Sequence, residues 1–308
     1  MSASTTVQVP SGARRTVAVK PIEVSTTGRA FDLQVKITAP VDGADLPVIV
    51  FSHGNAWSMD GYEPLVDRWA SRGFVVVQPT HLDSRRFGIG FDDPRFSTIW
   101  SVRIADVHSV IDQLPDLVRQ VDGLDRRADL ARIAVAGHSW GGQTAGAILG
   151  ARVLDEDGHP GDDFSHPAVT TGVVIAATGT GDTLTPFAAQ HLPFMRPDFS
   201  TMVAPALVVA GDRDDSAMST RGPDWFTDAY HLSPGRKRLV TIHDGEHTLG
   251  GVAGESVAET SDEDPGRVAL VADVAAAHLL DTFGLDREPW AYVVDGASND
   301  ERYTVEEK

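Results

Sequence analysis

The stretch Ala136–Gly142 reads AGHSWGG, and the fold and chemistry of this chain are best approached from it. It contains the pattern Gly-x-Ser-x-Gly with Ser139 at its centre, directly after the apolar β-type run Ala131–Ala136. The small residues of Gln143–Leu149 predict a helix on the other side. A serine at a sharp turn from strand to helix presents its hydroxyl as a nucleophile would. The five-residue pattern also arises by chance, so the rest of the chain must supply the partners of such a serine.

Composition excludes several classes of function. The 308 residues are 42% hydrophobic and 23% charged, as in ordinary globular proteins. The net charge of −18 argues against nucleic acid or an anionic membrane surface as the main partner. The lack of cysteine excludes disulfides, thiol nucleophiles and cysteine metal sites. Because residues 1–15 are polar and no run approaches 18 apolar residues, we expect a soluble, cytoplasmic protein with no signal peptide and no membrane span.

Apolar strand-like runs alternate with helical segments along most of the chain, after two β-rich segments at Thr16–Val24 and Phe31–Thr38. The later strands are expected at Leu46–Phe51, Phe74–Val77, Ile133–Ala136, Val173–Ala177, Ala206–Ala210 and Arg238–Ile242. Helices are expected at Tyr62–Ser71, Ile99–Val118, Gln143–Leu149, Trp225–Tyr230 and Val268–Phe283. This alternation predicts an α/β fold with a mostly parallel central sheet, an antiparallel N-terminal edge and helices on both faces.

Further details of the organisation follow from the same pattern. We expect residues 1–308 to form one domain, with loose tails at 1–13 and 295–308. The segment Ala177–Pro205 has room for a small lid at most. The helix Ile99–Val118 should kink or end at Pro115. Its predicted apolar face consists of Val102, Ala105, Val107, Val110, Ile111 and Leu114.

The general base of such a serine should be a histidine on a loop after a late strand. His247 lies in DGEHT (residues 244–248), just after the strand Arg238–Ile242. His243 is a rival, but it sits at the end of the strand itself, where its direction is less free. We therefore prefer His247 on placement. Activity that needs a neutral histidine should rise with pH through about 6–7, because the reference histidine pKa is about 6.5.

The carboxylate that orients this base should follow the neighbouring strand, Ala206–Ala210. That strand runs into GDRDD (residues 211–215), where Asp212, Asp214 and Asp215 compete for the role. Acids beside a glycine turn are also common as turn residues or helix caps. The chain order of serine, acid and histidine is the α/β-hydrolase order, and it differs from that of chymotrypsin and subtilisin.

An oxyanion needs two backbone N–H donors. The residue after the nucleophile, Trp140, supplies one of them in sites of this kind. The other should come from the loop SHGNA (residues 52–56), which follows the first buried strand. Gly54 permits a sharp turn there that aims the next amide inward.

Together these segments give the chain a resemblance to the α/β-hydrolase superfamily over roughly Leu46–Phe283. The resemblance is carried by FSHGN (51–55), GHSWGG (137–142), GDRDD (211–215) and DGEHTLGG (244–251). Within the superfamily the chain is most similar to the chlorophyllase-like and platelet-activating-factor-acetylhydrolase-like bacterial hydrolases. The resemblance implies the following roles: Ser139 as nucleophile, His247 as base, Asp214 as acid with Asp215 in reserve, and the Asn55 and Trp140 amides as oxyanion donors.

These residues predict a carboxylic ester hydrolase that works through a Ser-His-Asp triad and an acyl-enzyme. The alternatives are amide cleavage or acyl transfer on the same triad, and a non-catalytic ligand-binding protein on a hydrolase fold. No His-Glu-x-x-His spacing occurs, and no Gly-x-Gly-x-x-Gly or P-loop follows a strand. We therefore expect no metal, no cofactor and a small-molecule ester as the partner.

Two further groups of residues lie near the expected site. His81, Asp83, Arg85 and Arg86 follow the strand Phe74–Val77. Charged loop residues of this kind are usually solvated, and contact with the pocket is the alternative. Tryptophans could line an apolar site or simply pack in the core; those in question are Trp57, Trp100 and Trp225.

Overall fold

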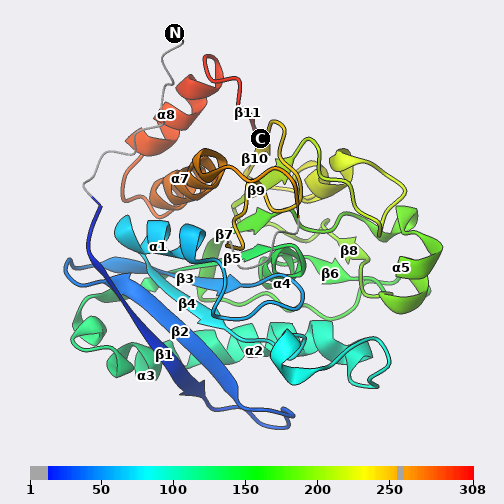
Figure 1. Cartoon of the computed structure of the whole chain (residues 1–308), viewed down its shortest axis with the longest axis horizontal. Helices are drawn as coiled ribbons and strands as arrows, with labels where there is room; N and C mark the ends of the chain where they lie inside the picture. Colours follow the sequence, from blue (N-terminus) through cyan, green and yellow to red (C-terminus); the bar gives the residue numbers. More distant parts are fainter. Residues whose placement is uncertain (1–12, 255–259) are drawn as a thin grey trace.

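A twisted, mostly parallel sheet forms the centre of this computed structural model, which describes residues 13–254 and 260–308. Within the described residues the sheet has nine strands in the order β1-β2-β4-β3-β5-β7-β9-β10-β11. Their bounds are β1 Thr16–Val24, β2 Leu33–Pro40, β3 Leu46–Ser52, β4 Val75–Pro79, β5 Ala128–His138, β7 Val169–Ile175, β9 Ala206–Gly211, β10 Lys237–Ile242 and β11 Tyr303–Glu307. The strands from β4 to β10 pair in parallel, whereas β1 and β2 form an antiparallel N-terminal edge. The predicted fold class is therefore confirmed (Figure 1).

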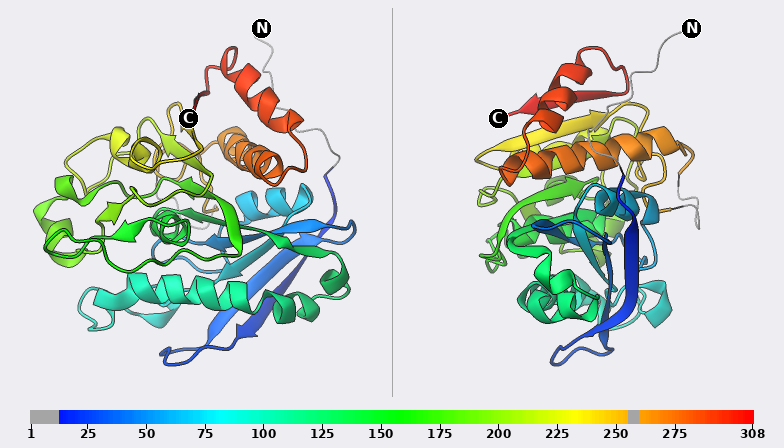
Figure 2. Two further views of the ribbon diagram at one scale, coloured as in Figure 1. Left: turned by 180° about the vertical axis from the view of Figure 1, so that it is seen from behind. Right: turned by 90° about the vertical axis from the view of Figure 1, so that its left-hand side faces the viewer.

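Helices cover both faces of the sheet (Figures 1 and 2). The helices are α1 Glu63–Ser71, α2 Ile99–Asp112, α3 Leu114–Leu117, α4 Trp140–Ile148, α5 Pro186–His191, α6 Asp228–His231, α7 Pro265–Thr282 and α8 Glu288–Ala297. Side chains alternate along each strand, so Val48 and Val50 of β3 pack in the core with α2, α3 and α4. Their neighbours Ile49 and Phe51 pack on the other face with α1, α7 and α8. Burial on both faces explains why the parallel strands are continuously apolar.

The predicted helix Ile99–Val118 is divided, and its buried face contains most of the predicted apolar residues together with two charged ones. Helix α2 ends at Asp112, and Pro115 lies in the first turn of α3, where a missing amide proton is tolerated. On α2, Ala105 is exposed, whereas Arg103 and Asp106 are buried. Val107, Val110, Ile111 and Leu114 are buried as predicted, but the prediction counted only apolar residues as core-facing and so missed two charged side chains that have buried partners.

The prediction of a loose C-terminal tail at 295–308 was wrong. Residues Tyr303–Glu307 form β11, which pairs antiparallel with β10 and closes the far edge of the sheet. Tyr303 is 1% exposed and donates its hydroxyl to the Val293 carbonyl of α8 at 2.8 Å. Glu307 accepts from Arg238 and from the Trp290 indole, each at 2.8 Å. The acidic sequence of β11 resembles a solvated tail, because the residues that bury and pair with this strand lie on other elements, β10 and α8. The N-terminal tail predicted at 1–13 lies almost wholly outside the described residues.

The segment Ala177–Pro205 contributes only small elements, as its length requires. It contains α5 and the short strand β8 (Pro197–Asp198), which pairs with β6 (Arg152–Val153). The α5 region carries Leu192, Phe194 and Met195 into a third apolar cluster, which also contains Phe96 and Trp140. This cluster places apolar side chains beside the turn that holds Ser139.

Candidate active site

Ser139 occupies a sharp turn between β5 and α4. Its backbone angles, φ 57° and ψ −122°, are unfavourable for a residue with a side chain. The Ser139 amide donates to the Ile175 carbonyl of β7 at 2.9 Å, which anchors the turn to the sheet. A Cβ on Gly137 would lie 2.0 Å from the Gly141 carbonyl oxygen, and one on Gly141 would lie 1.9 Å from that of Ser52. The two glycines of the motif are therefore required because strand, helix and the β3 loop meet without room for a methyl group.

The loops after β9 and β10 bring an acid and a histidine to this serine. His247 Nε2 lies 2.9 Å from Ser139 Oγ, and His247 Nδ1 lies 2.9 and 3.1 Å from the two carboxylate oxygens of Asp214. Parallel strands that end at the same edge of a sheet place their following loops together. The loops also touch, because a Cβ on Gly211 would lie 2.0 Å from the Gly245 carbonyl oxygen.

The rival residues lie elsewhere. Asp215 is exposed, whereas the Asp214 side chain is 1% exposed. Asp212 accepts from the Asp244 amide at 2.7 Å, so it closes a turn. His243 Nδ1 lies 2.6 Å from the Glu301 carbonyl oxygen and donates to it. The structure thus brings Ser139, His247 and Asp214 together and leaves the alternatives outside the group; the catalytic roles of the three remain predictions.

Burial controls the protonation of the groups around His247. Removal from water raises the pKa of Asp214 above its ordinary value, and the hydrogen bond from His247 opposes that shift. The adjacent His138 is wholly buried, which lowers its pKa to about 3. His138 is therefore neutral at physiological pH and carries one ring proton.

A hydrogen-bonded chain that the sequence analysis did not predict connects the loop after β3 to the backbone of His247. His138 Nε2 lies 2.8 Å from the His247 carbonyl, which can only accept, so Nε2 carries the proton. His138 Nδ1 then accepts from the Tyr62 hydroxyl at 2.9 Å, and that hydroxyl accepts from the Gly54 amide at 2.9 Å. The residue before Ser139 thereby holds the backbone of the loop that carries His247. The only sequence signal was the histidine inside GHSWGG.

The two predicted oxyanion residues flank Ser139. Trp140 is the first residue of α4, and first-turn amides of a helix have no acceptor within the helix. Asn55 is an exposed residue on the loop after β3. A Cβ on Gly54 would lie 3.5 Å from Ser139 Cβ, so this loop approaches the serine closely. Both positions are compatible with donors to an oxyanion, and their function stays a prediction.

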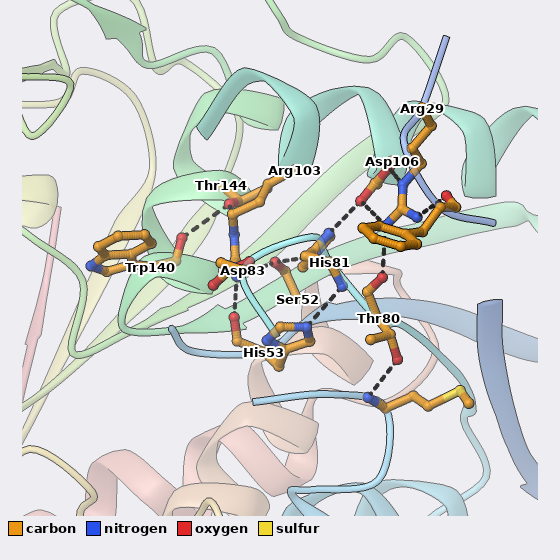
Figure 3. A network of polar contacts seen from close by, with 12 residues as sticks. Arg29, Ser52, His53, Thr80, His81, Asp83, Arg103, Asp106, Trp140 and Thr144 are labelled. Carbon is orange, nitrogen blue, oxygen red and sulfur yellow. Dashed lines mark hydrogen bonds and ion pairs between the residues drawn. The ribbon is translucent and has the colours of Figure 1, made fainter. Parts of the chain in front are cut away.

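The loop after β4 differs from its expected solvated state. Arg85 and Arg86 are exposed, but His81 and Asp83 are 0% and 4% exposed. Both take part in a buried polar network around Arg103 (Figure 3). Of the tryptophans, Trp225 is 1% exposed and packs in the core.

Comparisons with known proteins agree with this architecture. The family model of chlorophyllase matches residues 5–154. The observed fold is of the α/β-hydrolase type, and the first half of the chain is similar to chlorophyllases. The chloroplastic chlorophyllase-1 of Citrus unshiu and that of Citrus sinensis are each 31% identical to this chain over 112 residues. Chlorophyllase type 0 of Chenopodium album is 30% identical over 112 residues. The aligned part is 36% of this chain and spans only 31% of the length of each of these relatives.

The family match covers the part of the hydrolase fold that contains the β3 loop and the serine turn. The loops of Asp214 and His247 lie beyond residue 154, so their assignment depends on geometry. Among the described residues, no group of three or more histidines or acids is arranged to hold a metal ion. In the same described part of the chain, no helix is long and apolar enough to cross a membrane.

Proposed function

We propose that this protein is a carboxylic ester hydrolase with Ser139, His247 and Asp214 as its catalytic triad. The observation that carries the proposal is the continuous line of hydrogen bonds from Ser139 Oγ through His247 to Asp214, with distances of 2.9 Å on both sides of the ring. The similarity to chlorophyllases, which hydrolyse an ester of chlorophyll, supports ester chemistry. A positive φ at Ser139 supports the same conclusion, since strain of this kind concentrates at functional sites.

The first half of the reaction acylates the serine. Ser139 Oγ attacks the ester carbonyl carbon while its proton passes to His247 Nε2. The Asp214 carboxylate accepts a hydrogen bond from His247 Nδ1 and stabilises the imidazolium that forms. The Asn55 and Trp140 amides donate to the oxyanion of the tetrahedral intermediate. His247 then gives its proton to the leaving alcohol oxygen, and the acyl group remains on Ser139.

The second half uses water in place of the alcohol. His247 removes a proton from water, the resulting hydroxide attacks the acyl carbon, and the returned proton restores Ser139 as the acid leaves. The ring of His247 must hold one orientation through both halves. The bond from His138 to its carbonyl and the bond from Nδ1 to Asp214 support such a fixed position.

Apolar neighbours of Ser139 favour esters with an apolar acyl or alcohol group. The Trp140 ring contacts Phe194 and Phe96, with ring centroids 5.3 and 5.9 Å apart. The Phe226 ring lies 5.6 Å from that of His247. Each methylene removed from water is worth about 0.8 kcal/mol, or about fourfold in kcat/KM, until the apolar surface is filled. A series of p-nitrophenyl esters from acetate to octanoate measures this slope.

Replacement of the nucleophile tests the proposal. Ser139→Ala should lower kcat for a p-nitrophenyl ester by about 10³-fold or more and abolish labelling by a fluorophosphonate probe. Ser97→Ala, at an exposed serine, is the matched control and should behave like the unaltered protein. Substantial turnover by Ser139→Ala would exclude the assigned nucleophile. Failure of the unaltered protein to react with the probe would favour a non-catalytic binding protein. Assays with the corresponding amide and with added alcohols separate hydrolysis of esters from amide cleavage and acyl transfer.

A further inference from the structure

The buried guanidinium of Arg103 lies between the two segments that carry the predicted oxyanion amides (Figure 3). Arg103 belongs to α2 and is 1% exposed. Its Nη1 donates to both carboxylate oxygens of Asp83, each at 2.7 Å. Its Nη2 donates to the His53 carbonyl and, at 3.2 Å, to Ser52 Oγ. Nε donates to Thr144 Oγ1 at 3.2 Å, so every nitrogen of the guanidinium has a partner.

On one side these bonds hold the β3 loop on both flanks of Asn55. The Arg103 guanidinium binds the His53 carbonyl, two residues before Asn55. Asp83 accepts from the Ala56 amide at 3.2 Å, one residue after it. The ion pair therefore fixes the backbone on either side of the residue whose amide is assigned to the oxyanion.

On the other side the bonds reach the first turn of α4. Thr144 Oγ1 accepts from Arg103 and donates to the Trp140 carbonyl at 3.0 Å. Trp140 supplies the second predicted oxyanion amide. A single guanidinium thus joins both halves of the predicted hole, and Ser139 lies between them.

The charges in this network are balanced, so it is compatible with a rigid, buried support. Burial alone would raise the pKa of Asp83, but the charge of Arg103 and its hydrogen bonds more than offset burial and hold that pKa below its ordinary value, beside two uncharged histidines. The histidines are His53 and His81, and burial lowers the pKa of each well below its ordinary value, so both stay neutral. His81 Nδ1 lies 2.9 Å from Asp106, which also pairs with Arg29. The remaining bonds are also internal, since the His81 amide donates to His53 Nε2 at 3.0 Å.

We propose that Arg103, together with Asp83 and Thr144, sets the spacing and direction of the two oxyanion amides and is a positioning element of the active site. The proposal rests on the ester-hydrolase function proposed above. A misdirected amide stabilises the transition state less and leaves substrate binding nearly unchanged, so kcat should fall while KM holds. Loss of one donor in such a hole costs about 10²–10³ in kcat, and misplacement should cost part of that.

The chain offers matched pairs of variants. Thr144→Val removes the hydroxyl that joins Arg103 to the Trp140 carbonyl, whereas Thr144→Ser keeps it. Arg103→Lys keeps the charge opposite Asp83 but loses the fork that reaches several acceptors at once. Arg68→Lys is the control for loss of a partly buried arginine fork, because Arg68 binds Asp273 between α1 and α7, away from these loops.

The decisive readout compares an ester with the thionoester that has sulfur in place of the carbonyl oxygen. Sulfur is a weaker acceptor, so a well-placed oxyanion hole favours the oxygen ester, and a disturbed hole loses this preference. We expect Arg103→Lys and Thr144→Val to lower kcat for the oxygen ester by about 10–100-fold, with KM within about threefold. The oxygen-to-sulfur ratio should fall in parallel. Thr144→Ser and Arg68→Lys should keep both the rate and the ratio.

Each outcome has a definite meaning. If Thr144→Val keeps kcat and the ratio, or if both substrates lose rate equally in the folded variants, the positioning role is wrong. If Arg103→Lys does not fold, the two Thr144 variants decide the question. The proposed ester-hydrolase function is tested separately: it is rejected only if the unaltered protein is inactive or if Ser139→Ala remains active.

Discussion

Asp214→Asn should separate catalysis from stability at one buried position. The carboxylate accepts from His247 Nδ1 at 2.9 and 3.1 Å, and the side chain is 1% exposed. In the proposed acylation step His247 becomes cationic. Two unit charges about 4 Å apart attract by about 4 kcal/mol at an effective dielectric constant of about 20. The neutral amide forfeits this attraction, so kcat/KM should fall by about 10³-fold.

The same substitution should not destabilise the fold at neutral pH. Burial raises the pKa of Asp214, so the folded state binds its proton more tightly than the unfolded chain does. The resulting stability is present below the unfolded pKa of about 3.9 and is lost as pH rises through the folded pKa. At pH 7 the fold therefore carries an ionised carboxylate at a cost, which asparagine removes. The variant should be as stable as the unaltered protein or more stable at pH 7, and the difference should shrink on acidification towards pH 4.

The assays are initial rates with a p-nitrophenyl ester and urea unfolding across this pH range. Asp215→Asn makes the same change of charge one residue away on the exposed side of the loop. It should keep activity within about twofold, because the exposed charge is screened by water. The reasoning would be refuted if kcat/KM fell less than tenfold in Asp214→Asn, or if it fell more in Asp215→Asn than in Asp214→Asn. A marked loss of stability at pH 7 in Asp214→Asn would show that the carboxylate is a net structural support.

Two further substitutions test the scaffold of the site. Gly141→Ala places a methyl group 1.9 Å from the Ser52 carbonyl oxygen, so the free energy of unfolding, measured with heat or urea, should fall by about 3 kcal/mol or more. Gly146→Ala in the same helix is its control, because the added methyl group meets its nearest atom at 3.9 Å. This control should be neutral or should stabilise the fold by up to about 1 kcal/mol. Tyr62→Phe leaves His138 Nδ1 and the Gly54 amide without their hydroxyl partner. The free energy of unfolding in urea should therefore fall by about 2–3 kcal/mol. A fall of less than about 0.5 kcal/mol would mean that water replaces the hydroxyl.

Local pattern and chain order were enough to predict the parallel sheet and the serine turn. A run such as Leu46–Phe51 is apolar throughout because both of its faces are covered, and this periodicity is visible without any partner. The choice between Asp214 and Asp215 needed more than pattern. It depends on how one loop turns, and that turn is set by bonds such as the one from the Arg213 amide to the Gly245 carbonyl on the neighbouring loop. Neighbours on the chain can point in opposite directions without any change of composition.

The parts that the sequence could not predict are those whose stability depends on partners far along the chain. An isolated buried charge is too costly to keep, so a charged residue on a helix is normally assigned to the solvent face. Arg103 and Asp106 reverse this rule because their partners come from two other segments: His81 and Asp83 from the loop after β4, and Arg29 from the loop between β1 and β2.

A buried ion pair of this kind is weak evidence for added stability, since apolar residues of similar size often stabilise a core as well. Its donors do, however, fix directions that apolar packing leaves free. Arg103 is the exception on α2 to the rule that only apolar residues face the core. Its hydrogen bonds reach the His53 carbonyl directly and the Trp140 carbonyl through Thr144. Local rules are expected to fail where function imposes its own geometry. The failure of the rule at Arg103 is therefore itself a reason to assign this side chain to the active site rather than to the core alone.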